Sequence, residues 1–232
     1  MTKENILFLA VGLLLGLIVG FVVTNNLNQS GMQMMPGGTQ PTSGMPSGHP
    51  GVPGDPSQPG GMQDVQSTID KARQNPNDFD AQLEAAKVYY QIQRFDGAVE
   101  FLKRANELKP DDYDTLVNLA NAYFDSGKYE DAEKTYLSAL EKKKDDVNVR
   151  TDLGLTFIFR EKPDYDRAIK EFTASLQLDP NHVQTLQNLT VAYTKKGDAA
   201  KAQETLAKLE SVDAGNAAIT RLRDDIAKIG TK

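Results

Sequence analysis

The sequence predicts an all-α fold: a solenoid of about four helix pairs with capping helices, preceded by an N-terminal transmembrane helix and a disordered linker. Three observations predict the solenoid. A pattern of large and small apolar residues returns four times at intervals of 34 to 36 residues. Within each copy these residues recur three or four apart on two segments, as on amphipathic helices. A short break such as Gly127-Lys128 separates the two segments. Such units bury their apolar faces by stacking on their neighbours.

The first element is an apolar run within residues 5–24. From Ile6 to Val23, eighteen consecutive residues lack a polar side chain. A helix of that length is about 27 Å long, close to the thickness of the hydrocarbon core of a bilayer. The alternative is a cleaved signal peptide, which would have a shorter apolar run and an Ala-x-Ala site; no such site follows here. We therefore expect an uncleaved membrane anchor.

Positive charge predicts the orientation of this anchor. Lys3 and the α-amino group precede the span, and no Lys or Arg follows until Lys71. The positive-inside rule then keeps the N-terminus in the cytoplasm and exports the rest. In a bacterium the protein would span the inner membrane once and place the repeats in the periplasm.

Three glycines share one face of the predicted span: Gly12, Gly16 and Gly20. Small residues at this spacing let two helices pack closely in lipid, which predicts a homodimer through the transmembrane helix. The alternative is that glycine is simply common in membrane spans.

Residues 25–62 form the predicted linker, which is rich in Gly, Pro, Ser, Gln and Met. This composition lacks the apolar side chains needed to offset the entropy of ordering, so we expect disorder. Thioethers suit Cu(I), and five methionines lie here with His49. They are scattered through a low-complexity run that its composition explains. We predict no metal site and no cofactor.

The repeat region begins with an N-terminal capping helix at 63–76, which has Val65, Ile69 and Ala72 on one face. Proline, or a residue in the equivalent place, ends each unit, and this divides the chain into repeats at 77–110, 111–144, 145–180 and 181–214. The third repeat is two residues longer, at the turn near Pro163, where extra length is tolerated. A C-terminal capping helix at 215–230 has one apolar and one charged face.

In the clearest copy the repeating residues are Leu119, Ala120, Tyr123, Ala132, Tyr136 and Ala139. This pattern resembles the signature of the tetratricopeptide repeat family, and the whole layout resembles membrane-anchored bacterial members of that family. The resemblance implies a concave groove, lined by the first helix of each pair, that binds a protein or an extended peptide. The layout is also similar, more weakly, to cytochrome c maturation factors that contain such repeats.

The groove candidates are side chains of the first helices that are not used in packing. We predict that these residues bind the peptide: Lys87, Tyr90, Asn118, Asn121, Phe124, Asp152 and Asn188. An asparagine side chain offers both a donor and an acceptor to a peptide backbone; the alternative is that these asparagines are solvated or bond neighbouring helices. Some family members hold a carboxylate with a clamp of Lys, Asn and Arg. Here Leu83, Asn148 and Asp152 stand in its cationic positions, so the resemblance does not imply that ligand.

Composition excludes several function classes. The chain has no cysteine, two histidines and a formal net charge of −6. Thiol chemistry is excluded, and no basic stripe indicates nucleic-acid binding. No phosphate-binding or nucleophile motif occurs, and the repeats occupy nearly all of the chain after Asp64. We predict a non-enzymatic, membrane-tethered adaptor for an unidentified protein or peptide client. The alternatives are a factor that holds apocytochrome c during its maturation, or a structural protein that associates with itself.

Overall fold

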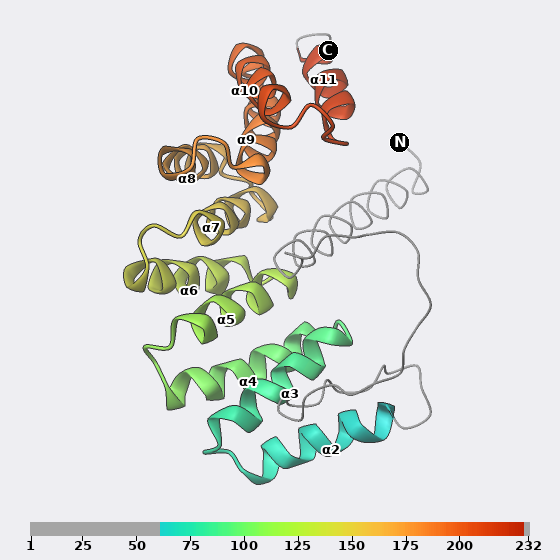
Figure 1. The fold of residues 1–232 in the computed structure, drawn as a ribbon, viewed down its shortest axis with the longest axis vertical. Helices are drawn as coiled ribbons and strands as arrows, with labels where there is room; N and C mark the ends of the chain where they lie inside the picture. Colours follow the sequence, from blue (N-terminus) through green and yellow to red (C-terminus); the bar gives the residue numbers. More distant parts are fainter. Residues whose placement is uncertain (1–60, 230–232) are drawn as a thin grey trace, which may run out of the picture. The chain divides into compact units, whose positions relative to one another are not determined.

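The computed structural model describes residues 61–229, which form a stack of ten helices and no strand (Figure 1). The helices, coloured from cyan at α2 to red at α11, are α2 Gly61–Gln74, α3 Phe79–Gln91, α4 Phe95–Leu108, α5 Tyr113–Asp125, α6 Tyr129–Lys142, α7 Val147–Phe159, α8 Tyr165–Leu178, α9 Val183–Lys196, α10 Ala199–Val212 and α11 Ile219–Ala227. Each helix packs on the next one in the chain. The all-α prediction and the predicted array of about ten helices are confirmed.

The predicted membrane span at residues 5–24, with Gly12, Gly16 and Gly20, lies outside the described residues. So does the predicted linker at 25–62, apart from its last two residues, which fall in the first turn of α2. Within residues 61–229, no helix is both long enough and apolar enough to cross a bilayer.

A small residue at one position of every second helix brings the two helices of each pair together. Ala98, Ala132, Ala168 and Ala202 occupy equivalent places on α4, α6, α8 and α10, and each is fully buried. Larger side chains such as Tyr136 fill the space around them. The alanines allow the two helices to approach closely, and the larger side chains interdigitate elsewhere. Each pair thereby buries an apolar face that one helix alone would expose.

Aspartate side chains cap five of the ten described helices. The Oδ1 atoms of Asp78, Asp112 and Asp146 accept hydrogen bonds from backbone N–H groups at the starts of α3, α5 and α7, at 3.0, 2.8 and 3.0 Å. Asp164 and Asp198 cap α8 and α10 in the same way. The acidic residues that the sequence places at helix starts therefore serve the backbone, as expected of N-caps.

Three of the four turns within the pairs, all except the α7–α8 turn, use a left-handed backbone residue. Gly127 and Gly197 have φ of 75° and 84°, and an added Cβ would meet nothing within 4 Å at either place. In the first pair Gln93 takes this conformation, with φ 56°. A side chain with a Cβ is strained there, because this conformation brings the Cβ close to the backbone.

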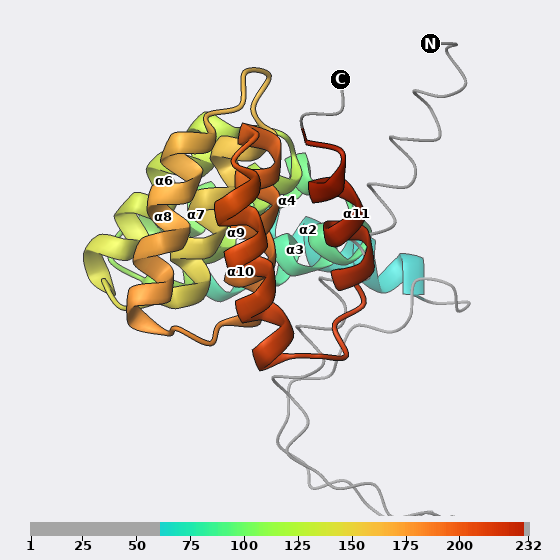
Figure 2. The same cartoon turned by 90° about the horizontal axis from the view of Figure 1, so that it is seen from above.

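One helix packs at each end of the described array, α2 at the start and α11 at the end. Ile69 and Ala72 on α2 are buried against α3, as predicted for a capping helix. At the other end, α11 contacts α9 and α10, as Figure 2 shows. Its first helical residue is Ile219, four residues after Gly215, where we expected the last element to begin. The intervening Asn216 accepts a hydrogen bond from the backbone N–H of Ala218 and so forms a turn.

The contact between the third and fourth pairs contains buried hydroxyl groups. Thr151 Oγ1 on α7 lies 2.9 Å from Ser175 Oγ on α8 and 2.6 Å from Thr185 Oγ1 on α9. His182 Nδ1 lies 2.6 Å from the same Thr185 oxygen. Because the hydroxyl groups bond one another, burying them leaves none of them unsatisfied.

Candidate functional site

All seven predicted binding residues lie on the first helices of the pairs. Lys87 and Tyr90 are on α3, and Asn118, Asn121 and Phe124 are on α5; Asp152 is on α7 and Asn188 is on α9. Asn118, Asp152 and Asn188 occupy equivalent positions, 34 and 36 residues apart. We call the side of the stack that these residues share, together with Asp125, the first-helix face.

Hydrogen bonds join this face across repeats. The hydroxyl group of Tyr90 on α3 donates to Oδ2 of Asp125 at the end of α5. The hydroxyl group of Tyr136, buried on α6, donates to Asn121 Oδ1 at 2.6 Å. Two predicted residues, Tyr90 and Asn121, are thus positioned by partners that the prediction did not include.

Aromatic rings gather next to Asp125. The ring of Phe124 meets Tyr129 edge-on, with centroids 5.4 Å apart, and meets Phe159 edge-on at 5.6 Å. Tyr129 and Phe159 stack at 6.3 Å. These three rings come from α5, α6 and α7 and form an apolar wall. Each ring is only half-buried, so part of the wall stays open to solvent.

Two carboxyl groups on this face have raised pKa values. Burial, followed by the negative charges of Asp125 and Asp146, raises the pKa of Asp152 to about 7. Burial also raises the pKa of the Asp125 carboxyl, although the hydrogen bond from Tyr90 opposes that shift. Both effects disfavour the charged form, because a carboxylate withdrawn from water loses hydration.

No cation compensates these two carboxylates within the described part of the chain. Neither Asp125 nor Asp152 takes part in any of the ion pairs there. Elsewhere acidic groups are paired: Glu133 contacts Arg160 and Arg167. On the first-helix face, the half-buried Asp152 and the more exposed Asp125 therefore carry negative charge without a counter-ion.

The remaining predicted residues are less connected. Asn188 is half-buried, and its Nδ2 atom is buried without a hydrogen-bond partner. Lys87 and Asn118 are exposed, and neither makes a hydrogen bond or ion pair with another described residue. Lys87 and Asn118 are therefore available to a ligand. Asn188 occupies the position equivalent to Asn118, two repeats further on, and its amide nitrogen is an unsatisfied donor.

Three residues of this site were not expected on the groove side: Tyr129, Tyr136 and Phe159. Asp125 was expected on that side but was not one of the seven predicted binding residues. A sequence signal existed for Asp125, which lies two helical turns after Asn118 and so on the same helix face. Tyr136 was recognised only as a packing residue of the repeat. Nothing in the linear pattern shows that its hydroxyl group would reach Asn121 on another helix.

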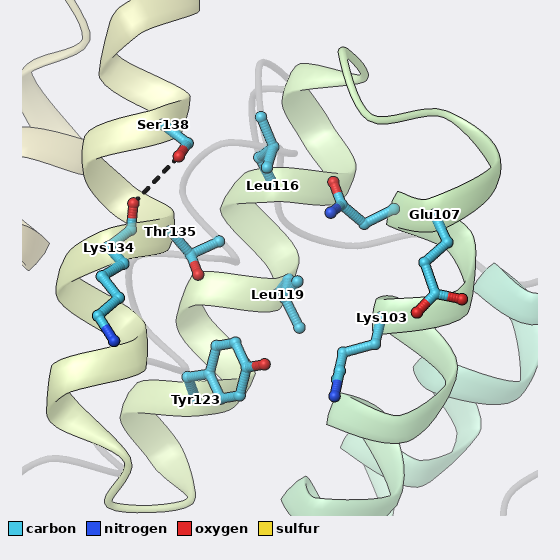
Figure 3. A pocket seen from close by; sticks show the side chains of 9 residues that line it. Lys103, Glu107, Leu116, Leu119, Tyr123, Lys134, Thr135 and Ser138 are labelled. Atoms are coloured by element: carbon cyan, nitrogen blue, oxygen red, sulfur yellow. Dashed lines mark hydrogen bonds between the residues drawn. The ribbon is translucent and has the colours of Figure 1, made fainter.

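A cavity of about 250 Å³ lies elsewhere, between α4, α5 and α6 (Figure 3). Leu116, Leu119 and Tyr123 of α5 line it, with Lys103 of α4 and Lys134 of α6 among the polar residues at its sides. None of the predicted binding residues lines this cavity. Among residues 61–229, no cluster of three or more His, Cys, Asp or Glu residues could hold a metal ion.

Comparison with protein families finds tetratricopeptide repeats over most of the array. One family model described as tetratricopeptide repeat matches residues 93–151 and 160–226, and a second with the same description matches residues 69–113. The first alone covers more than half of the chain. No curated protein sequence matches the chain significantly.

Solved structures share the same arrangement of helices. MamA from Desulfovibrio magneticus RS-1 (residues 41 to the end) is 17% identical, with a TM-score of 0.60 over 67% of this chain and 87% of that one. A MamA structure from strain AMB-1 is 24% identical, with a TM-score of 0.56 over 69% and 87%. Another MamA crystal structure is 19% identical, with a TM-score of 0.55 over 71% and 90%. At these identities the likeness concerns the fold.

Proposed function

Since the chain belongs to the tetratricopeptide repeat family, we propose that it is a membrane-tethered adaptor that holds a segment of a client protein on its first-helix face. Proteins of this family are interaction scaffolds and are typically non-enzymatic. One observation carries the choice of face. Successive first helices present polar and aromatic side chains, from Tyr90 to Asn188, that packing between helices does not consume.

The chemistry of this face suits an extended peptide. The exposed Asn118 amide and the unsatisfied Nδ2 of Asn188 are donors for backbone carbonyl groups. The ring wall of Phe124, Tyr129 and Phe159 offers apolar surface to a side chain of that peptide. We expect a micromolar dissociation constant for such a contact, which corresponds to a binding free energy of about −8 kcal/mol.

The proposed tether is residues 5–24, which the sequence predicts to span the inner membrane with the repeats in the periplasm. A tether increases the effective concentration of a weak binder near other membrane components. The full-length protein should stay in the membrane pellet after alkaline washing, and deletion of residues 1–24 should release it. An enzyme reporter that works only in the cytoplasm, fused after Lys232, should be inactive. Activity of that fusion would reject the orientation.

Site-specific photocrosslinking tests the proposed face. A photoreactive amino acid replaces Asn118 on α5, which is exposed and bonds no other described residue. The matched control replaces Gln203, an exposed amide on the second helix α10. We expect Asn118 to capture the same identified protein in repeated preparations and Gln203 not to. Capture at Gln203 alone would show that the client binds another surface.

A further inference from the structure

The first-helix face carries uncompensated negative charge beside an aromatic wall. Asp125 and Asp152 come from neighbouring repeats, and burial together with the charge of Asp125 raises the pKa of the half-buried Asp152 carboxyl. Asp152 bonds to no other described residue and is only partly open to solvent. An ionisable group kept in such a costly state is a candidate for binding a ligand rather than for stabilising the fold.

The aromatic rings restrict the chemistry of that ligand. Phe124 precedes Asp125 in the chain, and its ring lies edge-on to Tyr129 and Phe159, with centroids 5.4 and 5.6 Å away. Burial, and after it the charge of Asp125, raises the pKa of the Tyr129 hydroxyl group at the start of α6. A cation gains from a carboxylate and from an aromatic face at the same time, whereas an anion gains from neither.

We propose that the first-helix face binds an extended segment of a partner protein through its arginine or lysine side chains, with Asp125 and Asp152 as the anionic residues that receive them. The inference rests on the proposed function and specifies its partner. Asn118 and Asn188 flank Asp152 at equivalent positions in the neighbouring repeats. They bind the peptide backbone on either side of the basic side chain.

Tyr90 and Tyr136 position this site. The Tyr90 hydroxyl group donates to Asp125 and leaves the second carboxylate oxygen for the ligand. Tyr136 donates to Asn121. Burial raises the pKa of both tyrosines, so they stay neutral hydrogen-bond donors at physiological pH.

Charge also favours a different protein over a second copy of this chain. The chain carries a formal net charge of −6, with its basic residues interspersed among acidic ones. Two copies would repel one another, whereas a basic partner is attracted toward the face and oriented as it approaches.

Peptide binding to the purified full-length protein tests the inference. One fluorescent peptide has an extended Gly-Ser backbone with arginine at every third position; the other has glutamate in those places. Fluorescence anisotropy measures both. We expect the arginine peptide alone to bind, and Asp152→Asn and Asp125→Asn to weaken it by about 10- to 100-fold each. The matched control, Glu204→Gln with Asp224→Asn, removes two exposed charges from α10 and α11 and should change binding less than about twofold.

Each outcome decides the question. Equal binding of the glutamate peptide, or an equal loss in the control variant, would overturn the cationic site. Loss of peptide binding as the protein concentration rises would show that a second copy occupies the face, and would overturn it as well. If neither peptide binds while Asn118 still crosslinks to a client, the cationic site is refuted and the adaptor function stands. Circular dichroism of each variant confirms that it is folded.

Discussion

Replacing Asp152 by asparagine should stabilise the protein, although it removes a group that we assign to the binding face. In the folded protein the Asp152 carboxyl has a pKa of about 7, against an ordinary value of 3.8. Folding therefore takes a carboxylate partly out of water beside the charges of Asp125 and Asp146. Asparagine has nearly the same shape and carries no charge, so it avoids that cost.

The size and sign of the effect follow from proton linkage. A raised pKa means that the folded state binds a proton more tightly than the unfolded state does. The stability that this proton provides is complete below pH 3.8 and is lost as the pH rises through about 7. The full shift corresponds to about 4 kcal/mol, and water reaching this half-buried residue reduces it to about 1–3 kcal/mol. The advantage of Asp152→Asn is therefore greatest above pH 7 and shrinks toward pH 4.

Urea denaturation followed by circular dichroism, at about pH 8 and about pH 5, measures this difference. The matched control is Asp224→Asn on α11, which removes the same charge from an exposed position and should change the free energy of unfolding by less than about 0.5 kcal/mol. An Asp152→Asn variant that is less stable than the native protein at pH 8, or whose advantage does not depend on pH, would refute the reasoning.

Four further substitutions test the packing, the turns and a helix cap, each by the free energy of unfolding in urea. Gly154→Ala should destabilise by about 1–3 kcal/mol, because the new Cβ would overlap the ring of Phe172; an unchanged value would show that the ring moves aside. Gln93→Gly should stabilise by about 0.5–1 kcal/mol by relieving a positive φ, and Gly197→Gln, where a Cβ meets nothing, should cost about 1 kcal/mol. Asp112→Ala should cost about 1 kcal/mol near pH 7. Hydrogen bonds hold the pKa of that carboxyl below its ordinary value, so the loss should fade as the pH drops below 3.8; a loss that persists at low pH would contradict this account.

The helices could be predicted because their signals are local. Apolar residues at helical spacing identify the buried faces, and alanines one repeat apart, such as Ala98 and Ala132, mark where two helices meet closely. Aspartates mark the starts of three of the four first helices, α3, α5 and α7, since a short carboxylate side chain caps free N–H groups. The start of α11 was less accurate, because Asn216 begins a turn rather than a helix.

The binding face was only partly predictable. Periodicity assigned Tyr90, Phe124 and Asp152 to the first helices, since residues a whole number of helical turns apart share a side. It did not reveal that Tyr90 would bond Asp125, 35 residues away. The pKa of a carboxyl group depends on its burial and on the charges and hydrogen-bond donors around it. Neither can be judged from the residue type.

The sequence by itself therefore determined the class of fold, the order of the helices and the side of each helix that is buried, because a 34-residue period of apolar side chains expresses all three. Tertiary stacking alone decided which polar groups meet. It brought the Tyr90 hydroxyl group to the Asp125 carboxylate of the next repeat, and it joined Thr151, Ser175 and Thr185 into one buried network. The physical reason is that electrostatic and hydrogen-bond energies depend on distance and on exclusion of water. Packing sets both, and spacing along the chain does not.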